Sequence, residues 1–226
     1  MDRIKYLVAV FTMILVVGFA QAQQISMQAV VPKLPQVLIQ DVTDEVLAAI
    51  LVANSYYQKD PERFYVKVEE IMAPVMDYQT FARTVMGRYG SSSAYRVLKT
   101  DEERAQFRAR VKGFTKVFRQ TIMNTYGKGL MAFNGEKITV LPLDEENMAK
   151  VAAGDYVQVV QVIRGEDGSD TKIYYKLKPD KYGEWKMRNV VIDTINLGQV
   201  YQSQFASAVK DNDGDIDKAI IAWAES

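Results

Sequence analysis

The polar and apolar residues of this chain follow a helical period in its first half and a strand-like period in its second. Apolar residues recurring every three or four positions predict helices over residues 44–59, 61–73, 77–86 and 101–126. Alternation with period two predicts strands over residues 137–143, 155–164, 171–178 and 184–192. Helical spacing returns over residues 198–209 and 216–225. This order predicts one α+β domain: N-terminal helices, a four-stranded antiparallel meander and C-terminal helices.

The two faces of the predicted sheet differ in polarity. Ile173, Tyr175 and Leu177 alternate with lysines, so that strand has one apolar and one basic face. The preceding strand is apolar on both faces, and the run Val190-Val191-Ile192 indicates a β-bulge near Asn189. A sheet this apolar must be covered by helices or must line a cavity, and the pattern alone leaves both open.

The first residues have the form of an export signal. Arg3 and Lys5 precede an apolar run of roughly 14 residues, which is shorter than the about 20 residues of a membrane span. Ala20-Gln21-Ala22 then supplies small residues where a signal peptidase cuts. We expect a signal peptide over 1–22, a flexible lead-in over 23–40 and a single domain over 41–226. A retained N-terminal anchor is the alternative.

The composition removes several classes of chemistry. The chain has no cysteine and no histidine, which excludes His- or Cys-based zinc sites and Ser-His-Asp or Cys-His hydrolases. Twenty-eight basic and 28 acidic residues give zero net charge, unlike a nucleic-acid-binding domain. We expect no metal, no nucleotide cofactor and no nucleic-acid partner. The acidic segment 211–217 lacks the EF-hand positions, so a turn and helix cap are favoured over weak calcium binding.

Two glycine pairs resemble phosphate loops at first sight. A dinucleotide fingerprint follows a strand and opens a helix, whereas Gly127-x-Gly129 and Gly87-x-x-Gly90 follow helices. Both pairs are therefore interpreted as helix C-caps.

An enzyme remains the alternative from a different class. Small NTF2-like α+β domains can hold a Tyr/Asp pair in an apolar cavity, as ketosteroid isomerases do. Asp193 ends the last predicted strand, but no second acid stands at a facing strand position. We therefore expect no catalytic residue.

The segment from Asp77 to Tyr89, DYQTFARTVMGRY, resembles the signature of the MlaC-like, or toluene-tolerance, family of periplasmic phospholipid carriers. Further matches in the same order are Phe107, Phe114, Thr125-Tyr126, Val140-Leu141-Pro142, Tyr174 to Leu177, Trp185 to Met187, Val190 to Leu197 and Tyr201 to Phe205. The resemblance covers roughly residues 40 to 225 and implies that Gly87, Arg88 and Tyr89 form a structural corner between two helices.

The resemblance also implies a ligand, partners and a compartment. The ligand would be a phospholipid whose tails lie in a closed apolar cavity. The partners would be an inner-membrane ABC transporter with a lipid-binding ring subunit and an outer-membrane lipoprotein–porin complex, with the carrier in the periplasm maintaining outer-membrane lipid asymmetry. The candidate cavity residues are Phe114, Phe118, Ile122, Val157, Val159, Ile173, Tyr175, Leu177, Met187 and Val191. An adaptor with a solid core would show the same sequence pattern, and a lipoprotein carrier would need more strands.

The export signal gives the first prediction. We expect cleavage after Ala22, because the small-residue site directly follows the apolar run. N-terminal sequencing of the periplasmic protein should therefore start at Gln23. A chain that starts well before Gln23 would contradict cleavage at this site.

Overall fold

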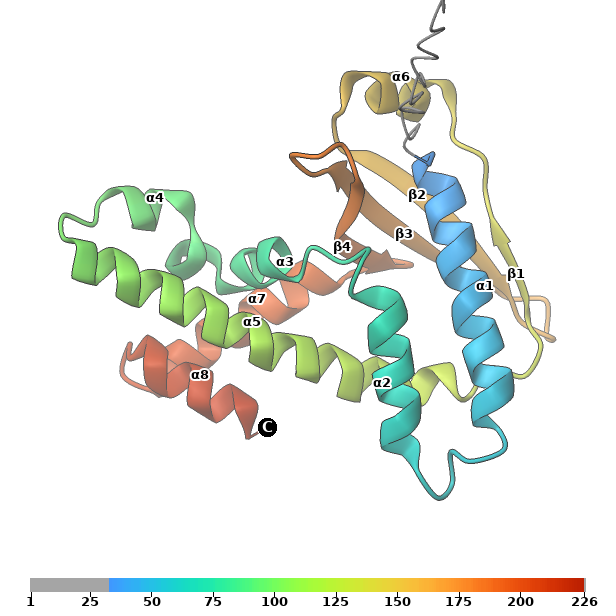
Figure 1. The fold of residues 1–226 in the computed structure, drawn as a ribbon, viewed down its shortest axis with the longest axis horizontal. Coiled ribbons are helices and arrows are strands. Elements are labelled where there is room, and N and C mark those ends of the chain that lie inside the picture. Colours follow the sequence, from blue (N-terminus) through green and yellow to red (C-terminus); the bar gives the residue numbers. More distant parts are fainter. Residues whose placement is uncertain (1–32, 226) are drawn as a thin grey trace, which may run out of the picture. The chain divides into compact units, whose positions relative to one another are not determined.

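An antiparallel sheet forms one part of the fold in the computed structural model, which describes residues 33–225 (Figure 1). The predicted signal peptide and cleavage site lie outside the described residues. The five strands are hydrogen-bonded in chain order: β1 (Lys137–Val140), β2 (Val157–Arg164), β3 (Asp170–Pro179), β4 (Trp185–Ile192) and β5 (Ile195–Asn196). The α+β class is confirmed, with a short fifth strand added to the predicted four.

The helices precede, interrupt and follow the sheet. They are α1 (Pro35–Ala53), α2 (Pro61–Met72), α3 (Tyr78–Met86), α4 (Ser92–Arg96), α5 (Asp101–Leu130), α6 (Glu145–Ala153), α7 (Leu197–Asp211) and α8 (Ile216–Ala224). The sequence pattern did not predict α6. This helix has no buried residue, so no apolar stripe marks it in the sequence.

Helix α1 begins earlier than the sequence analysis predicted. It starts at Pro35, a residue type suited to the first helical turn, so the predicted lead-in over 23–40 is wrong for residues 35–40. Ile39 is buried, and Thr43, which precedes the predicted helix, lies inside α1, where its hydroxyl donates to the Ile39 carbonyl oxygen at 2.7 Å. The helix ends at Ala53, and turns rather than helix occupy residues 54–59.

Short-range side-chain hydrogen bonds cap three of the helices. The Asp77 carboxylate accepts from the Thr80 N–H at 2.9 Å and starts α3. Thr100 and Glu103 form a reciprocal capping box at the start of α5. Asp215 caps α8. Each cap uses residues within three positions of each other, so the local sequence is sufficient.

The predicted corner after α3 is a short 3₁₀ turn over Gly87–Gly90. Gly87 has φ 55° and ψ −125°, a conformation that side-chain-bearing residues rarely adopt, so the role predicted for this glycine is confirmed. The Arg83 Nε–H donates to the Gly90 carbonyl oxygen at 2.8 Å. Arg83, which the sequence analysis did not single out, therefore closes the turn.

Arg88 and Tyr89 hold the same corner in another way. The Arg88 guanidinium lies 4.8 Å from the centroid of the Tyr89 ring, and its Nη2–H donates to the Tyr89 hydroxyl oxygen at 2.6 Å. The Tyr89 ring packs edge-on against Phe205 of α7, with 6.2 Å between centroids. The corner thus joins α3 to α7.

The second glycine pair is not the helix end that the sequence predicted. Helix α5 continues through Gly127 and Gly129 and ends at Leu130. A Cβ atom at Gly127 would lie 2.8 Å from the Tyr65 ring, so this glycine permits close packing of α2 on α5. Its role depends on a residue more than 60 positions away and has no local signature.

The larger of the two hydrophobic clusters among the described residues joins α3, α5, α7 and α8 to β2, β3 and β4. Phe114 is fully buried, and its ring centroid lies 4.5 Å from that of Phe205 and 5.4 Å from that of Trp223. A smaller cluster joins α1 and α2 to the end of α5 around Phe64 and Met123. Helix α5 contributes to both clusters.

The predicted bulge in β4 is confirmed. Lys176 pairs with Asn189, but its neighbour Leu177 pairs with Met187, so Arg188 is the extra residue. An extra residue reverses the inward and outward alternation after it. Val190 and Ile192 therefore lie on the same face as Met187.

Between residues 33 and 225, no helix combines the length and the hydropathy that a membrane span requires.

The corner glycine gives a stability prediction. Gly87→Ala should lower the free energy of unfolding by about 1–3 kcal/mol, because alanine is strained at this φ and ψ. Its Cβ would also lie 2.8 Å from the Gln202 amide nitrogen. Gly113→Ala is the control: this site in α5 is exposed and open, so the variant should gain about 0.5–1 kcal/mol. Urea denaturation measures both, and equal stabilities would contradict the strained corner.

Candidate functional site

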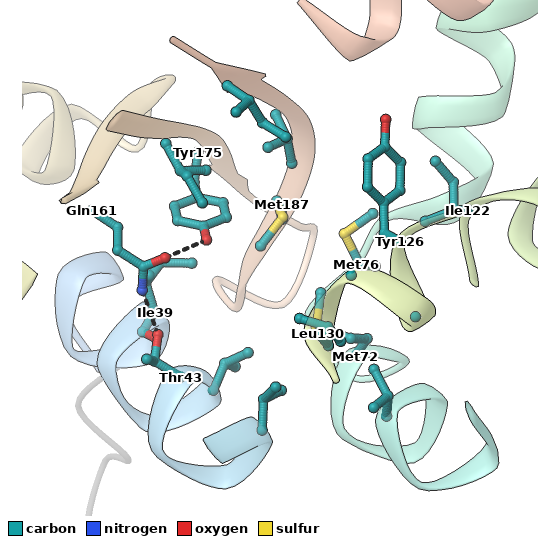
Figure 2. A pocket seen from close by; sticks show the side chains of 18 of the residues that line it. Ile39, Thr43, Met72, Met76, Ile122, Tyr126, Leu130, Gln161, Tyr175 and Met187 are labelled. Atoms are coloured by element: carbon teal, nitrogen blue, oxygen red, sulfur yellow. Dashed lines mark hydrogen bonds between the residues drawn. The ribbon is translucent and has the colours of Figure 1, made fainter. Parts of the chain in front are cut away.

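An apolar cavity of about 450 Å³ lies between the sheet and helices α1, α2 and α5 (Figure 2). This volume lies within the roughly 300–1,000 Å³ typical of small-molecule sites. The helices contribute Ile39, Val42, Val46, Leu47, Ile50, Val68, Met72, Ile122, Tyr126 and Leu130. The sheet contributes Ile138, Ile163, Ile173, Tyr175, Met187, Val190 and Ile192.

Strand pairing explains why these sheet residues share one face. Gln161 of β2 pairs with Ile173 of β3, and Ile173 pairs with Ile192 of β4. Directly paired residues in an antiparallel sheet point to the same side, and so do alternate residues along a strand. The cavity face therefore runs across β2, β3 and β4 in register.

Four of the ten candidate residues line the cavity. They are Ile122, Ile173, Tyr175 and Met187, which come from α5, β3 and β4. Their contact with a ligand stays a prediction.

Five candidates lie in solid core instead. These residues are Phe114, Phe118, Val157, Val159 and Leu177, all with at most 1% of their surface exposed. The Phe114 and Phe118 rings stack with centroids 5.8 Å apart, on the segment of α5 that packs against α7 and α8. Val157 pairs with Leu177 at the opposite end of β2 from the cavity wall. The alternation of a strand predicts which face is buried. It does not predict which residues of that face pack in the core and which line a cavity.

The candidate Val191 is on the wrong face. Without a bulge, Val191 would lie on the same face of the sheet as Met187. The extra residue Arg188 reverses the alternation and moves Val191 to the other face. Val191 pairs with Tyr174, which lies on the opposite face from Tyr175. Val190 and Ile192 occupy the cavity wall in its place.

The contribution of α1 to the cavity was not predicted from the sequence. Six of its side chains line the cavity: Ile39, Val42, Thr43, Val46, Leu47 and Ile50. Their spacing of three and four residues is a helical signal that begins before residue 43. The two nearby prolines favoured a flexible segment, which hid that signal.

Three polar side chains form a hydrogen-bonded chain in this apolar cavity, as Figure 2 shows. The Tyr175 hydroxyl donates to the Gln161 Oε1 at 2.9 Å, and the Gln161 Nε2 donates to the Thr43 Oγ1 at 2.7 Å. Burial raises the pKa of the Tyr175 hydroxyl above its usual value, so the group is protonated at neutral pH.

The acid proposed for an isomerase-like pair is not in the cavity. Asp193 is an exposed turn residue with φ 53°, and its carboxylate accepts from the Lys172 N–H at 2.8 Å. Among the described lining residues the one carboxylate is Glu136, which accepts from the Asn134 N–H at 2.8 Å. Tyr175 therefore faces an amide and not an acid.

The acidic segment 211–217 serves as a turn. Asp213 has φ 56°, and Asp217 forms a bidentate ion pair with Arg110 at 2.6 and 2.7 Å. Within residues 33–225, no group of three acidic side chains is arranged to hold a metal ion.

Comparison with known proteins gives consistent matches. The model of the family described as "MlaC protein" matches residues 40–225. The toluene tolerance protein ttg2D of Pseudomonas putida is 30% identical over 190 residues, covering 84% of this chain and 80% of that protein. The intermembrane phospholipid transport system binding protein MlaC of Haemophilus influenzae is 23% identical over 159 residues, covering 70% and 66% respectively.

A solved structure shares the fold. The phospholipid-binding protein of Ralstonia solanacearum, determined in complex with a phospholipid, superposes with a TM-score of 0.66. The match covers 84% of this chain and 94% of that chain at 20% sequence identity.

The polar chain of the cavity gives a stability prediction. Tyr175→Phe removes the donor to the Gln161 carbonyl oxygen, and an acceptor left unpaired in a buried site costs about 1–3 kcal/mol. We expect a loss of that size in urea denaturation. Tyr182→Phe is the control, because Tyr182 is 77% exposed and should unfold as the wild type does. A Tyr175→Phe variant as stable as the wild type would show that the hydrogen bond contributes nothing to folding.

Proposed function

The chain belongs to the MlaC protein family, and from this premise we propose that it is a phospholipid carrier. In this role it takes up a phospholipid at one membrane, encloses the acyl chains and releases the lipid at another. The site binds and does not catalyse.

The observation that carries this proposal is the apolar cavity. Removing one methylene from water contributes about 0.8 kcal/mol, and a diacyl phospholipid carries about 30 methylenes. A wall of aliphatic and aromatic side chains therefore suits acyl chains better than any polar metabolite. The charged head group stays at the mouth, in water.

The relatives support the same ligand class. The Haemophilus influenzae relative is named as a binding protein of an intermembrane phospholipid transport system, and the Ralstonia solanacearum structure contains a phospholipid. We assign this chain the corresponding task in the periplasm, after export and cleavage of its N-terminal segment. Its partners in this proposal are an inner-membrane ABC transporter with a lipid-binding ring subunit and an outer-membrane lipoprotein–porin complex. Shuttling between them maintains outer-membrane lipid asymmetry.

The function predicts that the natively purified protein carries phospholipid and that one substitution removes it. Tyr175→Asp places a carboxylate against the acyl chains, and an unpaired buried charge costs several kcal/mol. A cavity can lose its ligand more easily than a core can lose its packing. The variant should therefore fold and contain at least several-fold less lipid per chain than the wild type, measured by mass spectrometry.

Lys176→Asp is the matched control. Lys176 is the next residue on β3, is exposed, and lies on the opposite face of the sheet, so this variant should retain lipid. Circular dichroism checks the folding of both variants. Equal lipid content in the two variants, or native protein without any phospholipid, would count against the proposed function.

A further inference from the structure

Gln161 is an unusual residue for an apolar cavity. Among residues 33–225 it is the single polar residue in the buried core, with 4% of its surface exposed. It lies on β2 in the cavity wall, between the Tyr175 hydroxyl and Thr43 of α1 (Figure 2).

The hydrogen bonds of Thr43 determine which way the Gln161 amide points. The Thr43 hydroxyl hydrogen is donated to the Ile39 carbonyl oxygen at 2.7 Å, so Thr43 Oγ1 can only accept from Gln161. The amide nitrogen of Gln161 must therefore face Thr43, and its oxygen must face the Tyr175 hydroxyl.

This orientation leaves one hydrogen-bond donor unused. A glutamine amide has two N–H groups, and Gln161 donates one of them to Thr43. The second N–H has no hydrogen-bond partner within the described part of the chain. A buried donor without a partner is unfavourable, whereas a ligand that brings an acceptor satisfies it.

We propose that this second N–H of Gln161 donates to an ester carbonyl oxygen of the bound phospholipid. The inference rests on the proposed function and assigns to Gln161 the contact with the ester group of the lipid. It makes Gln161 a specificity-determining residue, because one hydrogen bond fixes how deep the ester group lies in the cavity.

The chemistry of the lipid leaves the ester carbonyl as the matching group. Acyl chains have no polar atom, and a phosphate needs cationic partners when it leaves water. No lysine or arginine stands among the described lining residues, and Glu136 would repel a phosphate. An ester carbonyl is uncharged, accepts a hydrogen bond and donates none, which matches a lone N–H.

The test compares two lipids that differ only at the carbonyl. Protein freed of its copurified lipid is offered equal amounts of a diacyl phosphatidylethanolamine and the dialkyl ether lipid of the same head group and chain length. Native mass spectrometry counts both complexes. The wild type should favour the ester lipid roughly five-fold, the effect of one neutral hydrogen bond.

Two variants show whether Gln161 is the cause. Gln161→Met keeps the length of the side chain without the amide and should bind both lipids equally. Gln158→Met is the control on the same strand: Gln158 is exposed on the other face and should leave the ester preference intact. If Gln161→Met unfolds, the double variant Gln161→Leu, Tyr175→Phe replaces it. Removing both members of the Gln161–Tyr175 hydrogen bond leaves no unpaired acceptor between them, so it destabilises the fold less than removing one. This double variant should also bind the ester and ether lipids equally.

The possible outcomes test the ester contact of Gln161 and the proposed carrier function separately. Equal binding of both lipids by the wild type, or an ester preference that survives the loss of Gln161, overturns the inference and leaves the carrier function standing. Failure of the wild type to bind either lipid overturns the carrier function itself.

Discussion

The site depends on one constraint: helices α1 and α2 must be held over the sheet while the cavity between them and the sheet stays unfilled. Protein interiors normally pack without voids, and an unfilled cavity weakens a fold. The two helices are held at the edge of the cavity, where Phe64, Val68 and Met123 pack in a separate cluster. The hydrogen bond between Gln161 and Thr43 joins α1 directly to β2 of the sheet. A ligand that fills the cavity would stabilise the folded state by mass action.

Helix α5 divides the structure into a filled part and an open part. Near its middle, Phe114 and Phe118 pack against α3, α7 and α8 in a fully buried aromatic core. One and two turns later, Ile122 and Tyr126 face the cavity. The filled part can therefore supply stability that the open part lacks. The walls of a cavity that binds and releases a ligand cannot pack against each other. Their stability must therefore come from a separate, filled part of the structure.

The segment before α3 connects the family signature to the bulge of β4. The Asp77 N–H donates to the Met187 carbonyl oxygen at 2.8 Å, and the Met187 N–H donates to the Val75 carbonyl oxygen at 2.7 Å. Arg188, the extra residue of the bulge, forms an ion pair with the Asp77 carboxylate at 3.1 Å. The bulge thus turns the basic side chain of Arg188 toward the start of α3, while Val190 and Ile192 line the cavity.

The sequence by itself determined the features that depend on neighbours in the chain. Caps such as Thr100, the strand alternation, the antiparallel order and the bulge need only residues a few positions apart. The tertiary structure decided which apolar residues meet a void: Phe118 and Ile122 lie on one stripe of α5, yet only the arrangement of helices around them makes one core and the other cavity wall. It also decided that Val191 points away and that Gln161 meets Thr43, 118 residues earlier. Burial is a property of what surrounds a side chain, and no local pattern encodes those surroundings.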